Sequence, residues 1–292
     1  MRDTVRAAAV CMGGLPGRTK DNLAAIDEWA ARAACEGADL ALFPELCVTG
    51  FLPNHPRGEH DVWLREALRI ARRTAEPLDG FAVNALAGIA KDRGLFIAAG
   101  MLEDAGNVLF NTHVLVGPDG LAGAWRKMHV PMYELPFYNG GPAPDVAQTP
   151  LGRIGANICF DALMPESARL LAVRQVEIAL FPFAADPPPC TPAGWSAWAG
   201  PAVRARCVEN GIFGVACNYS GYVEAAGAEQ RFPGGATIVG PRGDVIAEWD
   251  GPAGEPGMIV AGLRAETLRE ARAEPEYLFR FRRPELYGAL AK

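Results

Sequence analysis

The feature that most constrains the fold of this chain is an apolar segment that ends in a cysteine. It follows a Pro-Leu-Gly turn, runs from Ile154 to Cys159, and breaks sharply before Pro165-Glu166. Proline suits the first position of a helix and acidic residues suit its first turn, so a helix is expected over residues 165–173. The segment predicts a strand–turn–helix unit with a thiol at the carboxyl end of the strand, where open α/β sheets build their sites.

A thiol in this position lies near backbone N–H groups, which favour the thiolate and can stabilise an oxyanion. Cys159 is therefore a candidate nucleophile. The alternative interpretation is that Cys159 is one more small buried hydrophobic residue, as free cysteines usually are. This segment alone favours the alternative, so the choice between the two interpretations of Cys159 depends on the rest of the chain.

Strand-like and helix-like segments alternate along the rest of the chain. Further strands are expected over residues 5–11, 39–43, 95–102, 109–116, 121–125, 178–181, 212–217, 236–239, 245–249 and 258–261. Further helices are expected over residues 61–74, 81–91, 196–210 and 263–272, and another, with Asp21 as its N-cap, contains Leu23 to Ala34. Pro201 predicts a kink or a later start in the helix over 196–210. The alternation predicts an α/β fold, and no linker is long enough to divide it.

Composition narrows the class of protein and its partners. Half of the 292 residues are hydrophobic and the net charge is −6, which is typical of a soluble globular enzyme. This charge gives no reason to expect nucleic acid or an anionic membrane as a partner. No uninterrupted apolar stretch reaches the length needed to span a membrane. We therefore expect neither nucleic acid nor a membrane as a partner.

The cysteines and histidines indicate the compartment and argue against a metal site. The seven cysteines are odd in number and show no paired spacing, and the start of the chain leads directly into strand-like sequence without a signal-peptide apolar region. Together these features predict reduced thiols in the cytoplasm. The chain has four histidines and neither a CxxC nor an HxxxH pattern. We expect no dedicated metal site and no cofactor.

Two charged side chains stand at strand ends in the same way as the cysteine. Glu45 follows the strand over 39–43, and Lys127 follows the strand over 121–125. The three groups could share the chemistry of covalent hydrolysis, in which a thiolate attacks, a carboxylate takes its proton and an ammonium stabilises the oxyanion. Taken singly, Glu45 could equally cap a helix or loop, and Lys127 could be a solvated surface lysine.

The ordered set of motifs resembles the nitrilase superfamily, also called the carbon–nitrogen hydrolases. The motifs are Phe43-Pro44-Glu45-Leu46, Trp125-Arg126-Lys127-Met128-His129 and Ile158-Cys159-Phe160-Asp161. Further landmarks agree at residues 204–210, Asn218, residues 232–236, 241–243 and 283–287. Each motif is weak by itself, but the set is specific and the resemblance covers nearly the whole chain.

The resemblance implies a fold, an assembly and a set of roles. The fold would be a four-layer αββα sandwich, with residues 1–292 forming one domain. The protein would form homodimers or higher homo-oligomers, with residues 273–292 a tail that docks on the partner. Cys159 would be the nucleophile, Glu45 the general base and later acid, and Lys127 the oxyanion stabiliser. Glu134 matches a second glutamate that positions substrate and lysine, although it could also be a surface-loop carboxylate.

The same resemblance narrows the substrate. Phe160-Asp161 stands where nitrilases carry Trp-Glu, which favours hydrolysis of an amide or N-carbamoyl group over a nitrile. Leu163 and Met164 occupy positions at which carbamoylases for D-amino acids carry arginines, which favours a neutral or apolar substrate. The residues expected to contact it are Phe160, Tyr133, Met164 and Trp195. The loop over 186–194 with Trp195 and Trp198 would wall the pocket, although both tryptophans could instead belong to the core.

Three other interpretations stay open. A nitrilase would convert a nitrile to an acid and ammonia. A catalytically silent relative would act as a binding protein, which the complete set of Glu45, Lys127 and Cys159 argues against. A papain-like pairing of Cys159 with His129 is conceivable, but the resemblance makes this histidine part of the supporting structure.

Overall fold

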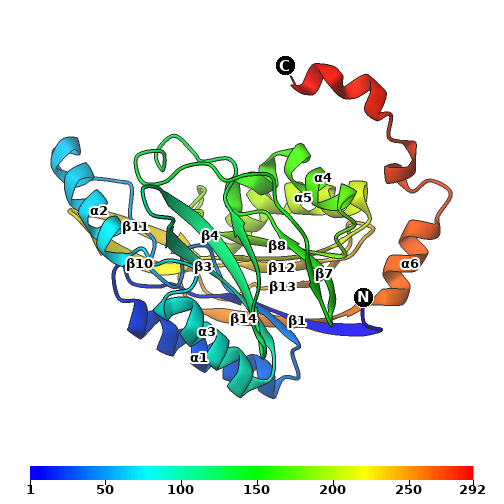
Figure 1. The fold of residues 1–292 in the computed structure, drawn as a ribbon, viewed down its shortest axis with the longest axis horizontal. Helices are drawn as coiled ribbons and strands as arrows, with labels where there is room; N and C mark the ends of the chain where they lie inside the picture. The colour runs from blue at the N-terminus through cyan, green and yellow to red at the C-terminus, as the bar shows by residue number, and fades with distance from the viewer. Residues whose placement is uncertain (292) are drawn as a thin grey trace.

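Two six-stranded β-sheets pack face to face at the centre of the computed structural model, which describes residues 1–291 (Figure 1). The first sheet has the order β14-β1-β2-β3-β4-β5, with β1 (Thr4–Cys11), β2 (Leu40–Leu42), β3 (Phe96–Asp104), β4 (Leu109–Gly117), β5 (Gly120–Arg126) and β14 (Gly257–Arg264). The second has the order β13-β12-β9-β8-β7-β6, with β6 (Ala147–Thr149), β7 (Gly152–Ala156), β8 (Ile178–Phe183), β9 (Phe213–Asn218), β12 (Ala236–Val239) and β13 (Val245–Glu248).

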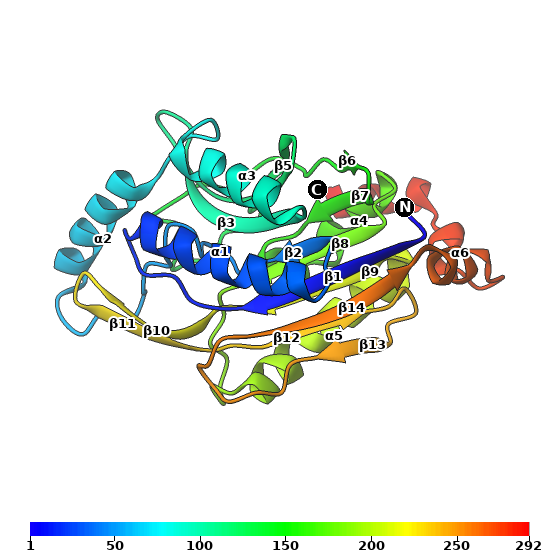
Figure 2. The ribbon, with the colours of Figure 1, turned by 90° about the horizontal axis from the view of Figure 1, so that it is seen from below.

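Helices cover the outer face of each sheet. α1 (Thr19–Cys35) and α3 (Phe81–Arg93) lie side by side against the first sheet (Figure 2), and α4 (Pro165–Val173) and α5 (Pro192–Asn210) cover the second. α2 (His60–Thr74) lies at one end of the molecule, near the hairpin of β10 (Ser220–Ala225) and β11 (Ala228–Pro233). The predicted four-layer αββα sandwich is confirmed.

Alternation of side chains along the strands produces this layering. In β4, Val114 and Val116 pack in the cluster under the helices, whereas Leu115 between them belongs to the cluster between the sheets. Leu42 of the first sheet and Leu180 of the second meet in the same inter-sheet cluster, and both are fully buried. Each strand of this kind is apolar on both faces, which explains why the sequence shows continuous apolar runs.

Several expected boundaries are wrong. α1 begins at Thr19, so Asp21 lies in its first turn instead of capping it, and Asp21 accepts a hydrogen bond from Arg18 Nε at 2.7 Å. α5 begins at Pro192, because Thr191 Oγ1 accepts a hydrogen bond from Gly194 N at 3.0 Å. Pro201 is therefore inside the helix and does not delay its start. The strands β6, β10 and β11 were not predicted from the sequence, since short edge strands and hairpins carry little apolar periodicity.

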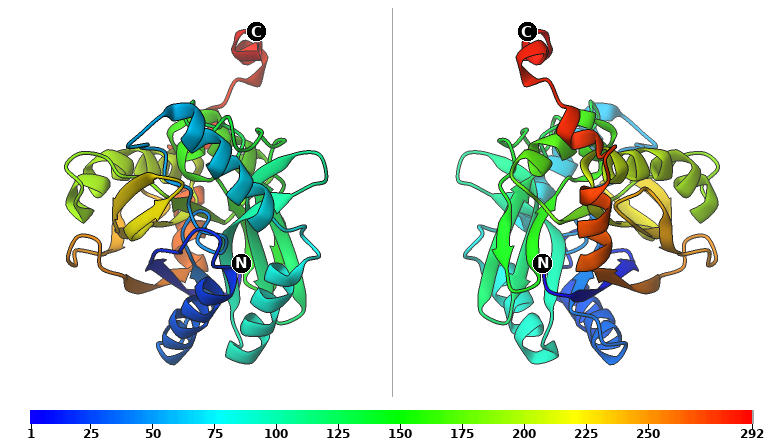
Figure 3. Two further views of the ribbon diagram at one scale, coloured as in Figure 1. Left: turned by 90° about the vertical axis from the view of Figure 1, so that its left-hand side faces the viewer. Right: turned by 90° about the vertical axis from the view of Figure 1, so that its right-hand side faces the viewer.

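The C-terminal segment begins with a helix that packs on the body of the molecule, and its end extends away from the body (Figure 3). It consists of α6 (Ala265–Ala273) and two 3-10 helices, η2 (Leu278–Phe281) and η3 (Pro284–Ala291). Large apolar side chains on it are exposed, including Phe281, Leu286 and Leu290. Residue 292 of the predicted tail lies outside the described residues. Within residues 1–291, the helices are all too short or too polar to traverse a bilayer.

Candidate active site

The carboxyl ends of four strands, two from each sheet, bring the predicted groups together. In the first sheet, Glu45 comes three residues after β2 and Lys127 comes directly after β5. In the second sheet, Cys159 comes three residues after β7 and Ala184 comes directly after β8. Because the two sheets pack face to face, these strand ends form one site at the edge of the sandwich.

Lys127 lies between two carboxylates. Its Nζ donates hydrogen bonds to Glu45 Oε1 at 2.7 Å and to Glu134 Oε2 at 2.6 Å. The side chains of Lys127 and Glu45 are fully buried, and Glu134 is nearly so. The Tyr138 hydroxyl also donates to Glu134 Oε2. Lys127 is thus not a solvated surface lysine, and Glu134 is not a free surface carboxylate.

The protonation state of Lys127 follows from these partners. Burial lowers the pKa of a lysine, but the charges of Glu134 and Glu45 more than offset it here, and the pKa of Lys127 stands well above its usual range. The group is therefore a permanent ammonium held at a fixed place. Such a cation can stabilise negative charge that develops on a substrate oxygen.

Glu45 is held by neutral donors as well as by the lysine. Asn111 Nδ2 donates to its Oε1 at 2.7 Å, and the backbone N–H of Ala184 donates to its Oε2 at 2.8 Å. Burial raises the pKa of Glu45, and the charge of Lys127 opposes that shift without cancelling it. A carboxylate with a raised pKa is a better proton acceptor than an exposed glutamate, which suits a general base.

The backbone that carries Glu45 packs unusually closely against β3. A Cβ atom added at Gly100 would lie 2.2 Å from the backbone nitrogen of Leu46. Leu46 itself has φ +53, a left-handed conformation that is uncommon for a non-glycine residue. Glycine at position 100 is therefore required for Glu45 to reach its place beside Lys127.

Cys159 is the first residue of the 3-10 helix η1 (Cys159–Leu163) and has φ +50. Backbone strain of this kind concentrates at functional sites. Burial and then the charge of Glu45 raise the pKa of the Cys159 thiol well above its usual range, and Lys127 opposes the shift. The thiol therefore lies within the electrostatic reach of both charged partners. It is neutral at rest and needs a base to become a nucleophile.

Asp161 connects the cysteine loop to the lysine loop. Its carboxylate accepts hydrogen bonds from the backbone N–H groups of Met128 at 3.1 Å, His129 at 2.8 Å and Ile158 at 3.2 Å. His129 Nδ1 also lies 2.8 Å from Asp161 Oδ1. The imidazole thus faces Asp161 instead of Cys159, which agrees with a supporting role for this histidine.

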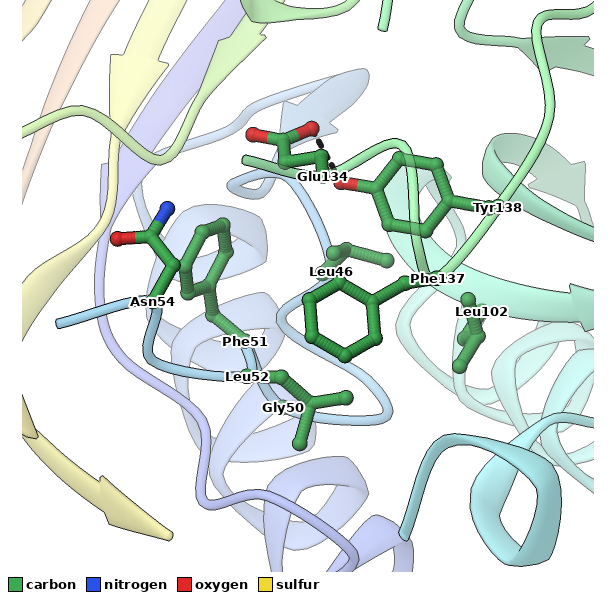
Figure 4. A pocket seen from close by; sticks show the side chains of 9 residues that line it. All are labelled: Leu46, Gly50, Phe51, Leu52, Asn54, Leu102, Glu134, Phe137 and Tyr138. Carbon is green, nitrogen blue, oxygen red and sulfur yellow. Dashed lines mark hydrogen bonds between the residues drawn. The ribbon is translucent and has the colours of Figure 1, made fainter. Parts of the chain in front are cut away.

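A cavity of ≈ 520 Å³ opens in front of Cys159. Its lining is largely apolar and aromatic, with a few polar groups: Phe51, Asn54, His55, Pro131, Tyr133, Glu134, Cys159, Phe160, Ala184, Ala185, Asp186, Pro187, Pro188, Trp198 and Gln230. A smaller cavity of ≈ 20 Å³ shares Phe51, Asn54 and Glu134 with it (Figure 4). Figure 4 shows the Tyr138 hydroxyl pointing to the Glu134 carboxylate at the edge of this apolar space.

The predicted substrate-binding residues fall into two groups. Phe160 and Tyr133 line the large cavity. Trp195 is 1% exposed and packs edge-on against Phe183 in the core, with ring centroids 5.7 Å apart. Of the two tryptophans, Trp198 lines the cavity. Met164, which directly precedes α4, does not belong to the cavity lining.

Sequence reasoning missed the neutral groups that complete the site. Asn111 and Tyr138 are ordinary members of a strand and a loop, and nothing local distinguishes them. Ala184 contributes only its backbone N–H, and its position directly after β8 is the signal that could have revealed it. Within residues 1–291 no cluster of three or more His, Cys, Asp or Glu side chains could hold a metal ion.

A buried thiol flanked by a carboxylate and an ammonium on an αββα sandwich defines a class of cysteine hydrolase. The family model described as carbon-nitrogen hydrolase matches residues 6–273. A nitrilase from Pyrococcus abyssi is 31% identical over 257 residues, covering 87% of this chain and 88% of that protein. A deaminated glutathione amidase from Mus musculus is 27% identical over 97% of this chain and 84% of that protein.

A comparison with solved structures supports the same family. A glutamine variant of an amidase from Nesterenkonia sp. AN1, with acrylamide added at its active-site cysteine, has a TM-score of 0.74. It is 26% identical and the match covers 98% of this chain and 99% of that one. The chain belongs to the carbon–nitrogen hydrolase family, the nitrilase superfamily. It is a hydrolase of carbon–nitrogen bonds.

Proposed function

We propose that this enzyme hydrolyses the amide or N-carbamoyl group of a small molecule through a thioester on Cys159. The observation that carries the proposal is the placement of Glu45, whose carboxylate is buried between Lys127 Nζ and the Ala184 N–H. Its raised pKa makes it a stronger proton acceptor, and the influence of its charge on the pKa of Cys159 supports the two groups being close enough for proton transfer.

The cycle begins when Glu45 takes the proton of Cys159 and the sulfur attacks the carbonyl carbon. Negative charge develops on the carbonyl oxygen, where Lys127 Nζ and the backbone N–H of Phe160 stabilise it. Phe160 lies in the first turn of η1, where helix geometry leaves N–H groups without an intrahelical acceptor. Collapse breaks the carbon–nitrogen bond, and the nitrogen leaves as ammonia or an amine with the proton from Glu45.

The second half of the cycle uses the same base. Glu45 takes a proton from water, and the resulting hydroxide attacks the thioester carbon. The carbon–sulfur bond breaks, and Cys159 recovers a proton from Glu45. The product that leaves is a carboxylic acid from an amide, or carbamic acid from an N-carbamoyl compound. Glu134 holds Lys127 from the side that faces the cavity, so it fixes the ammonium and contacts the substrate as it enters.

The test combines product analysis with trapping of the intermediate. A panel of small amides, N-carbamoyl compounds and matched nitriles is incubated with the wild type, and released ammonia is measured. Cys159→Ala should abolish turnover, whereas Cys35→Ala, an exposed cysteine on α1, should leave it unchanged. Glu45→Gln should accumulate an acyl adduct visible by intact mass, and Glu28→Gln on α1 should not.

Each outcome decides between the alternatives. Faster ammonia release from nitriles than from their matched amides would favour a nitrilase. No ammonia from any compound, together with no adduct, would favour a catalytically silent relative. Near wild-type turnover in Cys159→Ala would remove this residue from the mechanism.

We also propose that the enzyme is a homodimer or a higher homo-oligomer in the cytoplasm, with residues 273–292 docked on a partner subunit. The exposed apolar side chains near the end of the C-terminal segment, which projects from the body, support docking (Figure 3). The seven cysteines are all free, which suits a reducing compartment. Deletion of residues after 273 should shift the protein to a smaller species in sedimentation. If the truncated protein keeps the same number of subunits per particle, this proposal is contradicted.

A further inference from the structure

The outer part of the substrate cavity carries one carboxylate that lacks a strong partner. Two acidic side chains, Glu134 and Asp186, belong to the cavity lining. Within residues 1–291, the lining contains neither an arginine nor a lysine. Glu134 is already paired with Lys127. In the part of the chain that the structure describes, the one ion-pair partner of Asp186 is His55, whose Nε2 lies 3.4 Å from its Oδ2 and whose side chain is 64% exposed.

Aromatic side chains in the cavity lining also favour binding of a positively charged substrate group. Tyr133, Phe160 and Trp198 present aromatic surface to the same cavity. The negative faces of aromatic rings attract ammonium groups, most strongly those of tryptophan and tyrosine. Arg231, the basic residue near the loop that carries Asp186, has its guanidinium 5.0 Å from the Tyr222 ring and outside the cavity lining.

We infer that the enzyme prefers substrates that carry a positively charged amine at the end remote from the scissile amide, with Asp186 as its binding partner. This inference rests on the proposed amide hydrolysis and names a cationic class of substrate for it, in place of the neutral or apolar substrate expected from the sequence. Among residues 1–291, a substrate carboxylate would meet neither arginine nor lysine in the cavity lining and would be repelled by Asp186. The expected order of preference is cationic, then neutral, then anionic.

The size of the preference follows from the exposure of Asp186. Its side chain is 33% exposed, so water screens part of the attraction. An ion pair in such a partly solvated place changes an equilibrium by roughly two- to fivefold. We expect kcat/KM for a cationic amide to exceed that of the neutral amide of equal length by about fivefold.

The experiment compares three series of linear amides, four to six carbons long, that end in an amine, a methyl group or a carboxylate. Released ammonia gives kcat/KM for the wild type and for three variants. Asp186→Asn should reduce the preference for the amine to about twofold or less. Asp119→Asn, which removes the same charge from the exposed turn between β4 and β5, should keep it. His55→Gln should increase it, because Asp186 loses its competing partner.

The outcomes separate this inference from the proposed function. Hydrolysis of all three series at similar rates, or an undiminished amine preference in Asp186→Asn, would overturn the inference and leave amide hydrolysis standing. Hydrolysis of none of the compounds by a wild type that is folded by circular dichroism would overturn both. A preference that shrinks as salt is added would support an electrostatic origin.

Discussion

Two consecutive residues at the end of β5 form ion pairs of very different character. Arg126 pairs with Glu103, and Lys127 pairs with Glu45. Neighbouring residues of a strand point to opposite faces, so the two pairs lie on opposite sides of the first sheet. Arg126 is 31% exposed and stacks over the Phe110 ring at 4.0 Å, whereas Lys127 is fully buried.

The difference lies in how charge is balanced. Arg126 and Glu103 form a pair of equal and opposite charges, with the Thr112 hydroxyl as an additional donor at 2.6 Å. Lys127 serves two carboxylates at once, Glu45 and Glu134, so the buried group carries excess negative charge. That excess, together with burial, keeps the pKa of Glu45 raised. The balanced pair suits a structural role, and the unbalanced group suits the proposed role of Glu45 as a base.

The comparison is tested most strongly by the same substitution at both positions. Lys127→Met should reduce kcat by about 10³-fold, because the oxyanion loses its cation. It should also lower the free energy of unfolding by about 3–5 kcal/mol, because two buried carboxylates lose their partner. Arg126→Met should cost about 1–2 kcal/mol and change kcat only a few-fold. Ammonia release and urea unfolding measure both quantities. Equal losses in the two variants would contradict the distinction.

The second prediction concerns the anchor that fixes the position of Lys127. Asp161 holds the backbone of Met128 and His129 against the cysteine loop. Asp161→Leu should lower kcat by about 10²-fold with little change in KM, because displacement of reacting groups by about 1 Å has an effect of that size. Glu166→Gln, at an exposed acid in the first turn of α4, is the control. A loss confined to KM would assign Asp161 to substrate binding instead.

The third prediction concerns a titratable group that is buried in β4 near the site. His113 follows Asn111 by two residues on the same face of the strand, and burial lowers its pKa to about 3. The unfolded chain has the usual pKa near 6.5, so it binds more protons as the pH falls below that value. Between pH 6.5 and pH 5 this linkage should destabilise the fold by about 2 kcal/mol. His113→Met should remove that part of the pH dependence, as measured by urea unfolding. An identical pH slope in the variant would refute the assignment.

The smallest effect is expected from a neutral partner of Glu45. The hydrogen bond from Asn111 lowers the pKa of Glu45 and partly opposes burial. Asn111→Leu should therefore raise that pKa and move the acidic limb of the kcat/KM profile to higher pH by about one unit. Asn107→Leu, in the exposed turn before β4, should leave the profile unchanged. A shift to lower pH would have the wrong sign for this explanation.

The sequence by itself predicted the α/β class, its resemblance to a known family predicted the four layers, and the two together singled out three candidate reacting side chains. Pro165 and Glu166 predicted a helix over residues 165–173, and α4 has these bounds. The prediction was possible because the signals that start a helix are local in sequence. Glu45, Lys127 and Cys159 stood out because each follows a buried strand and carries chemistry that such a position can use. The roles assigned to them stay predictions until the variants are measured.

Only the tertiary structure decided which neutral groups surround these charges. Asn111 and the Ala184 N–H reach Glu45 across 66 and 139 positions of sequence. Sheet packing likewise placed Trp198 in the cavity lining and Trp195 in the core. Periodicity and motifs report on neighbours along the chain, whereas the partners of a buried charge are chosen by how two sheets pack against each other.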